Sequence, residues 1–366
     1  DELYLFALSM LLFGKNQPKR ASHPCVRPDR ARFLSALSYS LTGAQIRTID
    51  GIEADMTGDT LMSRLVVGDV GSGKTVCAAY AVYTALENGF QAALMAPTEI
   101  LANQHFTTIS EMLKDMGIRI ALLTGSTKKK ERTEIHQQLA DGSLQIIIGT
   151  HALLEDVVAF NNVGLVIIDE QHRFGVAQRA KLWHKNNIPP HVLVMTATPI
   201  PRTLAMTLYG DLDVSVIDEL PPGRKPITTL HAFDTKRQEI FKFIEQELKK
   251  GRQAYIVYPL ISESEKMDFR NLEEGYQKIN EYFLSKGYKT SMVHGKMKAV
   301  DKEEEMRLFV TGETQILVAT TVIEVGVNVP NASLMVIESA ERFGLSQLHQ
   351  LRGRVGRGLS LIHISE

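Results

Sequence analysis

A glycine-rich segment of eight residues constrains the fold of this chain more than any other part of its sequence. The segment Gly68–Thr75, with the sequence GDVGSGKT, fits the phosphate-binding pattern G-x-x-x-x-G-K-S/T. An expected strand, 64–67, precedes it and a helical stretch, 75–88, comes after it, so the pattern lies in the strand–loop–helix setting that it requires. The sequence therefore predicts an α/β fold that binds a nucleotide at this loop.

The residues of this loop have separate expected tasks. Glycines let the backbone turn so that successive amide groups point toward phosphate oxygens. Lys74 should contact the β- and γ-phosphates and take part in catalysis, and Thr75 should be a ligand of Mg²⁺. The loop residues expected to hold the nucleotide are Gly68, Gly71, Ser72, Gly73, Lys74 and Thr75.

Composition narrows the class of protein. The chain has 366 residues, which is room for two domains of ordinary size. Its net charge of -1 excludes a protein that coats DNA by bulk positive charge, while a local basic groove stays compatible with it. Cys25 and Cys77 have no metal-ligand spacing, so a reducing cytoplasm is expected rather than a disulfide framework. The apolar stretch Leu3–Phe13 is too short to span a bilayer, and no membrane partner is expected.

Two sets of alternating strands and helices are expected, separated by a proline-rich linker at Pro221–Pro226. Runs such as Ile146–Ile148 and Val166–Ile168 lack polar alternation, which is typical of strands buried on both faces of a parallel sheet. No obvious sequence repeat relates the two lobes, so we expect any kinship between them to be architectural. Strands are expected at 64–67, 92–95, 119–123, 146–149, 165–168 and 192–195 in lobe one and at 254–257, 290–293, 315–319 and 333–337 in lobe two.

Two carboxylates come directly after the buried run 165–168. Ligands of open α/β sheets bind at the carboxyl ends of the strands. We therefore expect Asp169 to hold Mg²⁺, and Glu170 to orient and polarise the attacking water. His172 could sense the γ-phosphate in the same turn. The segment Thr196–Pro199 ends another apolar strand, where its hydroxyl groups could relay the state of the cleft.

Small hydroxyl residues and helix starts gather at the ends of several other expected strands. Such groups and backbone amides make sequence-independent contacts to phosphates. We therefore expect a track for a nucleic-acid backbone, with similar positions in both lobes. The candidate DNA-binding residues are Pro97, Thr98, Gly125 and Thr150 in lobe one and His294, Thr320 and Thr321 in lobe two.

A second phosphate-directed segment lies far downstream, at Gln350–Arg357, with the sequence QLRGRVGR. Arginine is preferred over lysine for planar, bidentate phosphate contacts. Arg354 and Arg357 are the candidates to stabilise charge on a transferring phosphoryl group, and Gln350 is a further catalytic candidate. The long separation in sequence between this segment and Gly68–Thr75, the P-loop, indicates a two-lobed motor whose cleft closes on ATP from both sides.

Six segments together resemble the superfamily 2 helicases, and within them the bacterial DNA helicases that remodel branched DNA. They are Gly68–Thr75, Ala96–Glu99, Asp169–His172, Thr196–Pro199, Val318–Val329 and Gln350–Arg357. The sequences in and around these segments are specific to the family: DEQHRFGV at 169–176, TATPIPRT at 196–203 and ERFGLSQLHQ at 341–350. The resemblance covers residues 41–358.

The resemblance implies two tandem RecA-like P-loop NTPase lobes with parallel sheets, and ATP and Mg²⁺ as cofactors. It implies that Gln45 contacts adenine, and it adds Gly326 to the nucleotide-binding residues. It further implies translocation on double-stranded DNA and remodelling of stalled forks, Holliday junctions and R-loops in recombination and repair. Branched DNA is the expected partner, with single-stranded DNA-binding protein as a further candidate. We expect a monomer at the cytoplasmic nucleoid.

The resemblance also gives the expected domain boundaries. Residues 1–42 would be a connector behind an upstream wedge domain, 43–222 lobe one and 223–358 lobe two. The tail 359–366 does not resemble the segment that the family carries after Gly358, and we expect it to be non-native or truncated.

Three other functions compete with this interpretation. In the motor of a transcription-repair coupling factor, Glu would be expected in place of Gln171. The sequences of the motifs disfavour an RNA helicase. A nucleotide-switch module without motor activity is disfavoured because Glu170 and the arginines are parts that hydrolysis requires.

Overall fold

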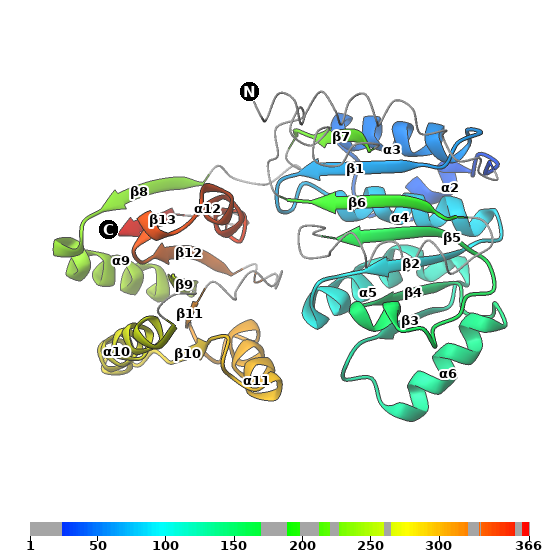
Figure 1. Cartoon of the computed structure of the whole chain (residues 1–366). Coiled ribbons are helices and arrows are strands. Elements are labelled where there is room, and N and C mark those ends of the chain that lie inside the picture. Colours follow the sequence, from blue (N-terminus) through cyan, green and yellow to red (C-terminus); the bar gives the residue numbers. More distant parts are fainter. Residues whose placement is uncertain are drawn as a thin grey trace, which may run out of the picture. The chain divides into compact units, whose positions relative to one another are not determined.

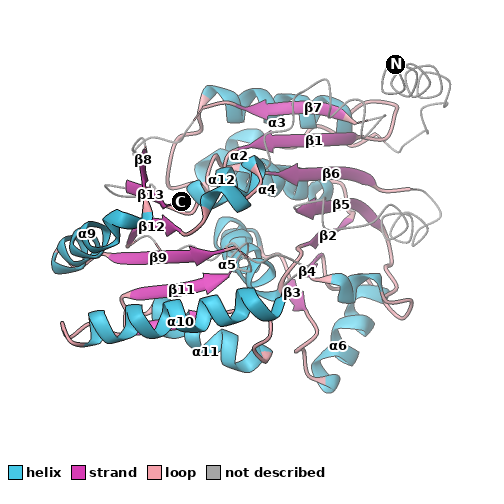
Figure 2. Cartoon of the chain, turned by 60° about the vertical axis from the view of Figure 1, so that its left-hand side comes forward, coloured by secondary structure: helices cyan, strands magenta, loops and turns pink. Residues whose placement is uncertain are grey.

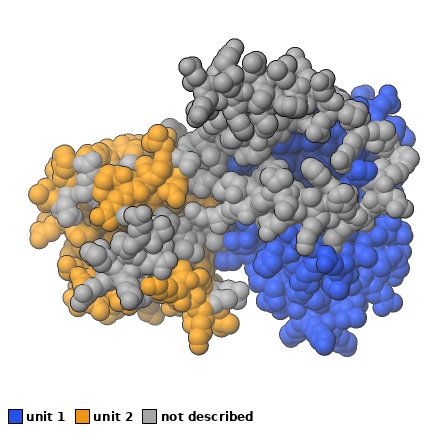
Figure 3. Space-filling model, viewed as in Figure 1, with its two compact units in different colours: residues 1–221 blue, residues 222–366 orange. Residues whose placement is uncertain are grey.

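The computed structural model describes residues 24–169, 189–197, 212–219, 227–259, 265–320, 329, 331–355 and 361–365. The chain divides into two compact units, Asp1–Pro221 and Pro222–Glu366 (Figure 3). Each unit is built on a sheet of parallel strands, which confirms the predicted α/β class. Among the described residues, no helix is long and apolar enough to cross a membrane.

Unit 1 contains a seven-stranded sheet in the order β3-β4-β2-β5-β6-β1-β7 (Figure 1). Its strands are β1 (Ser63–Gly68), β2 (Gln91–Met95), β3 (Ile120–Leu123), β4 (Ile146–Gly149), β5 (Val163–Asp169), β6 (His191–Thr196) and β7 (Asp213–Ile217). Its α-helices are α2 (Arg30–Ser35), α3 (Gly43–Met56), α4 (Lys74–Glu87), α5 (Glu99–Leu113) and α6 (Lys129–Ala140), with 3₁₀ turns at Lys114–Met116 and His151–Leu154.

Both faces of the central strands of this sheet are covered, as the continuous apolar runs predict. Helices α3, α4 and α5 pack on one face, against side chains such as Leu94 and Ile167. Ile135 and Leu139 of α6 pack on the opposite face, against the next residues along the strands, such as Ile168. The alternation follows from the two-residue period of a strand.

Unit 2 contains a six-stranded sheet in the order β10-β11-β9-β12-β13-β8 (Figure 1; seen from another side in Figure 2). Its strands are β8 (Thr228–Ala232), β9 (Gln253–Tyr258), β10 (Thr290–Val293), β11 (Ile316–Thr320), β12 (Ala332–Ile337) and β13 (Leu361–Ser365). Its α-helices are α9 (Arg237–Lys249), α10 (Glu265–Leu284), α11 (Ala299–Val310) and α12 (Leu345–Arg352), with 3₁₀ turns at Asp234–Lys236 and Ala340–Arg342. Helices α9 and α10 contribute to one apolar cluster on this sheet, and α11 and α12 contribute to another.

Three strands were not expected from the sequence. Strands β7 and β8 lie at sheet edges, and most of their residues are exposed or half-buried, so no continuous apolar run marks them. The segment Leu361–Ser365, expected to be a non-native or truncated tail, forms β13 and pairs in parallel with β12 and β8.

Behind the absence of an obvious sequence repeat, one stretch of unit 1 corresponds to one stretch of unit 2. Residues 117–150 align with residues 287–320 without a gap, and both stretches run loop, strand, helix, strand, with matching lengths for the first strand and the helix. The identical pairs are Gly117/Gly287, Gly125/Gly295, Lys128/Lys298, Glu134/Glu304, Gly142/Gly312, Gln145/Gln315, Ile146/Ile316 and Thr150/Thr320. The repeat is hard to see in the sequence because the kept residues serve local geometry and are scattered among diverged ones.

Hydrogen bonds repeat along with the sequence. Gln91 at the start of β2 and Gln253 at the start of β9 each donate from Nε2 to two backbone carbonyl groups, at 2.6 to 3.0 Å. The acceptors lie at matching positions of the repeat: Leu139 and Leu144 in unit 1, and Phe309 and Thr314 in unit 2. Gln145 and Gln315 likewise each accept a backbone N–H, from Arg119 and Lys289. The two units therefore share one local construction, and positions can be compared between them.

Candidate nucleotide-binding site

The P-loop connects β1 to α4 as the sequence predicts. Gly71 and Gly73 have positive φ values of 77° and 90°, which glycine adopts without the strain that a side chain would add. The amide of Ser72 donates to the carbonyl of Asp69 at 3.0 Å and closes the turn. Gly73 is the N-cap of α4, so Lys74 and Thr75 open the helix at its positive end.

Lys74 reaches back across its own loop. Its Nζ donates to the carbonyl oxygens of Gly68 and Asp69, at 2.7 and 3.0 Å. The ammonium group is thereby held at the carboxyl end of β1, inside the turn of the loop. Ser72 is fully buried, and its Oγ has no hydrogen-bond partner among the described residues.

Gln45, expected to contact adenine, braces the P-loop from behind. Its Nε2 donates to the carbonyl of Ser72 at 2.8 Å, and its Oε1 accepts from the amide of Thr42 at 2.9 Å. Thr42 and Gln45 form a capping box at the start of α3. The carboxamide is buried, and a contact with adenine is left one N–H and one oxygen lone pair.

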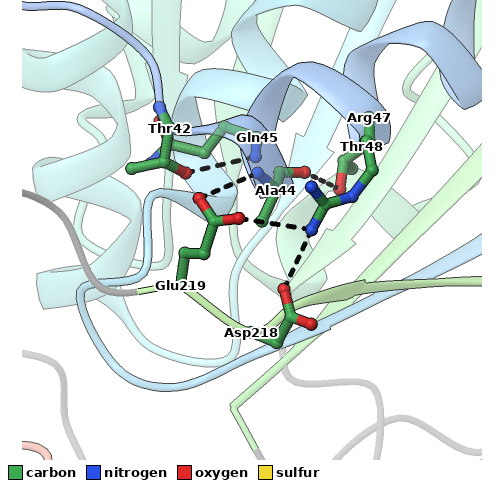
Figure 4. A network of polar contacts seen from close by, with 7 residues as sticks. All are labelled: Thr42, Ala44, Gln45, Arg47, Thr48, Asp218 and Glu219. Carbon is green, nitrogen blue, oxygen red and sulfur yellow. Dashed lines mark hydrogen bonds and ion pairs between the residues drawn. The ribbon is translucent and has the colours of Figure 1, made fainter.

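The start of α3 is also tied to the end of unit 1 (Figure 4). Glu219 comes after β7, and its carboxylate accepts from the amide of Ala44 at 3.1 Å. Arg47, one turn further along α3, donates to Asp218 at 3.2 Å and to Glu219 at 3.4 Å. We call these residues, 44, 47, 218 and 219, the α3 clamp. Carboxylates near a helix N-terminus also interact favourably with the helix dipole.

Asp169 ends β5 at the same edge of the sheet as the P-loop. It pairs in register with Met195 of β6, and Met195 pairs with Val66 of β1, so one strand separates Asp169 from the strand that enters the loop. Its carboxylate is buried and bonds to Nε2 of His105 at 2.7 Å.

His105 is a site residue that the sequence reasoning missed. It lies on the inward stripe of α5 with Ala102, Ile109 and Leu113, all of them buried. The signal was present, because a histidine among apolar residues at helical spacing needs a polar partner in the core. The partner could not be found, since it is 64 residues away in the sequence.

The lobe-one DNA candidates gather around two loops at the strand ends. Thr98 is the N-cap of α5 and accepts from the amide of Leu101 at 3.4 Å. Glu99 accepts from the amide and the hydroxyl of Ser126, at 3.1 and 2.8 Å, which ties the Pro97 loop to the exposed Gly125 loop. The hydroxyl of Thr150 is buried and has no hydrogen-bond partner among the described residues.

The lobe-two candidates repeat this arrangement. His294 and Thr320 are buried, and the Thr320 hydroxyl has no hydrogen-bond partner among the described residues, as for Thr150. Burial, followed by the nearby Lys302, lowers the pKa of His294 below its usual value, so this ring is neutral at neutral pH. Lys302 donates to the carbonyl of Gly295 at 3.0 Å.

Several predicted site residues lie partly or wholly outside the described residues. Arg354 lies just after α12, and its amide donates to the carbonyl of Leu351 at 3.0 Å. Gln350 belongs to helix α12, and its side chain lies outside the described residues. The other candidates outside the described residues are Glu170, Gln171, His172, Thr198, Pro199, Thr321, Gly326 and Arg357.

Two family matches cover most of the chain. Residues 42–207 match the DEAD/DEAH box helicase family, and residues 235–358 match the helicase conserved C-terminal domain. The matches coincide with unit 1 and unit 2 in that order along the chain.

Curated relatives narrow the family. The chain is 50% identical over 361 residues to "ATP-dependent DNA helicase RecG" of Aquifex aeolicus (strain VF5), covering 98% of this chain and 45% of that protein. It is 50% identical over 361 residues to the protein of the same name in Bacillus subtilis (strain 168), with 98% and 53% covered. The chain thus spans about half the length of the curated relatives it matches.

Solved structures agree with the sequence matches. A RecG bound to a three-way DNA junction superposes with a TM-score of 0.84 at 42% identity, covering 100% of this chain and 48% of that one. The helicase MrfA bound to DNA, at 19% identity and a TM-score of 0.70 over 95% of this chain and 52% of that one, shares the fold. Because the chain matches two helicase domains and is 50% identical in sequence to these relatives, it belongs to the RecG family of DNA helicases.

Proposed function

We propose that this chain is an ATP-hydrolysing motor that moves on double-stranded DNA and remodels branched DNA. The observation that carries the proposal is the P-loop of unit 1, which lies at the same sheet edge as a buried Asp169. The curated relatives, of which the chain spans about half, are named ATP-dependent DNA helicases, and a RecG structure that the chain resembles is bound to a three-way DNA junction.

The residues present fit a nucleotide phosphate and a divalent cation. The Gly68 backbone comes so close to Ser72 Oγ that a Cβ there would lie 2.5 Å from it, and Gly73 leaves equally little room. Such a tight turn of amides with a lysine beside it suits an anion, and a buried carboxylate suits a hard cation. Thr75 and Asp169 would hold Mg²⁺, which when bound neutralises charge on the phosphates.

We assign the roles in hydrolysis to individual residues. Glu170 orients the attacking water, and His172 senses the γ-phosphate. Arg354 and Arg357 stabilise charge on the transferring phosphoryl group, Gln350 takes part in catalysis, and Gly326 contributes to nucleotide binding. Gln45 contacts adenine through the hydrogen-bonding capacity that its bonds to Thr42 and Ser72 leave over.

The DNA backbone runs along equivalent loops of the two units. The repeat supports this assignment, because the Gly125 loop matches the Gly295 loop and Thr150 matches Thr320. Pro97, Thr98, His294 and Thr321 complete the track. We propose branched DNA as the substrate, single-stranded DNA-binding protein as a partner, and a monomer acting at the cytoplasmic nucleoid.

The function is tested by the rate of ATP hydrolysis with forked DNA, linear duplex, single strands and RNA at one salt concentration. We expect forked DNA to stimulate the rate most and RNA least. The full-length protein of a relative is the positive control. Equal stimulation by RNA and by forked DNA would remove branched DNA as the substrate, and no stimulation by any of them would remove the motor.

The repeat also brings out two lysines at matching positions, which we add to the proposed DNA-binding residues. Lys128 and Lys298 lie at the N-caps of α6 and α11, and both are exposed. Neither forms an ion pair with a described residue, whereas Arg132 and Lys302, one turn further on, donate to loop carbonyl groups. We propose that each lysine contacts one phosphate of the DNA.

Lys128→Ala and Lys298→Ala should therefore weaken DNA binding to a similar extent for every sequence. Each variant should reduce the slope of log K against log salt concentration by about 1, and the double variant by about 2. Lys242→Ala, an exposed lysine on α9, is the matched control and should leave the slope unchanged. An unchanged slope in the double variant, measured by fluorescence anisotropy, would contradict the assignment.

A further inference from the structure

His105 makes a contact that neither packing nor capping of its own helix requires. Its Nε2 lies 2.7 Å from Oδ2 of Asp169, and both side chains are 9% exposed. The bond joins helix α5 to the end of strand β5, two elements that are far apart in the chain. Asp169 is the carboxylate that our proposed function assigns to the divalent cation, so this inference rests on that function.

Helix α5 holds the histidine in place. Ala102, Ile109 and Leu113 bury the same stripe, and Ala102 and Ile109 belong to the apolar cluster that covers this face of the sheet. At its start, α5 is capped by Thr98 and tied to the Gly125 loop through Glu99. A helix fixed along its length and at its start gives the imidazole little freedom to move.

The bond constrains the carboxylate. The Nε2–H group donates a hydrogen bond to Oδ2, since an ionised carboxylate only accepts hydrogen bonds. A carboxylate with one oxygen fixed cannot rotate freely about its last side-chain bond, so its other oxygen keeps a set direction. Hydrogen bonds of this kind to metal-ligating carboxylates commonly change metal affinity or activity by about 10- to 100-fold when they are removed.

We propose that His105 is a positioning residue that orients Asp169 for the divalent cation of the bound nucleotide. His105 touches neither nucleotide nor DNA in this role. Its effect is specific to the cation: it changes how much Mg²⁺ strengthens nucleotide binding, and it leaves cation-free binding alone.

Two substitutions separate positioning from simple burial. His105→Gln keeps an N–H donor at about the reach of Nε2, whereas His105→Asn has a donor that is too short to reach Asp169. Both replace the ring by an uncharged amide, so loss of ring packing affects both. The experiment measures ADP affinity of the 366-residue chain by calorimetry, with Mg²⁺ and with EDTA, and monitors folding by thermal unfolding.

We expect His105→Asn to reduce the Mg²⁺-dependent gain in ADP affinity by about 10- to 100-fold, with the affinity in EDTA unchanged. His105→Gln should recover most of that gain. In ATP hydrolysis, His105→Asn should need more Mg²⁺ to reach half-maximal rate.

Three results would overturn the proposal. The first is a Mg²⁺ effect in His105→Asn equal to that of the unmodified chain. The second is an equal loss of affinity with Mg²⁺ and with EDTA in both variants, which indicates a packing role only. The third is an unmodified chain that binds ADP without any Mg²⁺ effect, which removes the proposed function along with the role of His105, whereas the first two leave that function intact.

Discussion

Replacing Lys74 with alanine should lower the rate of ATP hydrolysis by at least about 100-fold, because the variant loses the charged donor that we assign to the reacting phosphates. In the structure this ammonium group already lies in the loop, bound to the carbonyl oxygens of Gly68 and Asp69. The measurement is the hydrolysis rate with saturating forked DNA and ATP.

Lys114→Ala is the matched control, since Lys114 is an exposed lysine of unit 1 that pairs only locally with Glu111. It should hydrolyse ATP at the rate of the unmodified chain. Thermal unfolding of Lys74→Ala checks that the lost bonds to the loop do not unfold unit 1. DNA-stimulated turnover within about 10-fold of the unmodified rate in a folded Lys74→Ala variant would refute the role of the P-loop.

Gly73→Ala should have the second largest effect, on stability and on nucleotide binding together. Gly73 has φ of 90°, and a Cβ there would lie 2.2 Å from Nε2 of Gln45. The left-handed backbone costs about 1–2 kcal/mol with a side chain, and breaking the Gln45–Ser72 bond adds about 0.5–1.5 kcal/mol. We expect a total loss of about 1.5–3.5 kcal/mol and weaker ADP binding.

Gly89→Ala isolates the backbone part of this effect. Gly89 lies just after α4 with φ of 76°, and a Cβ there meets nothing within 4 Å. Its loss should be only about 1–2 kcal/mol, with ADP affinity unchanged. If the two variants lose the same stability by denaturant unfolding, Gln45 does not brace the loop.

Buried features of the fold were predictable because they leave a continuous signal. The runs around Ile147 and Ile167 are apolar without interruption, and each forms a central strand of the sheet in unit 1. The P-loop was predictable for a similar reason, since its glycines, lysine and threonine are adjacent in the sequence. Edge strands such as β8, with four of its five residues exposed, leave no such signal.

Features made by distant residues could not be predicted. The bond between His105 and Asp169, and the α3 clamp between Ala44 and Glu219, join positions 64 and 175 residues apart. A single sequence gives no indication of such partners. The repeat was hidden for another reason, because its kept glycines and glutamines fix turns and strand starts rather than a visible motif.

The α3 clamp has a mechanical consequence. Glu219 lies just before the proline-rich segment, so tension along the chain from that side reaches α3 through Glu219, Asp218 and Arg47. These side chains are 42%, 65% and 62% exposed, and such ion pairs contribute about 0–1 kcal/mol. The bond from Gln45 to Ser72 behind them is buried and shielded from water. When the chain is pulled from that side, we therefore expect the exposed ion pairs of the α3 clamp to break before the buried bond from Gln45 to Ser72, so that the P-loop keeps its conformation.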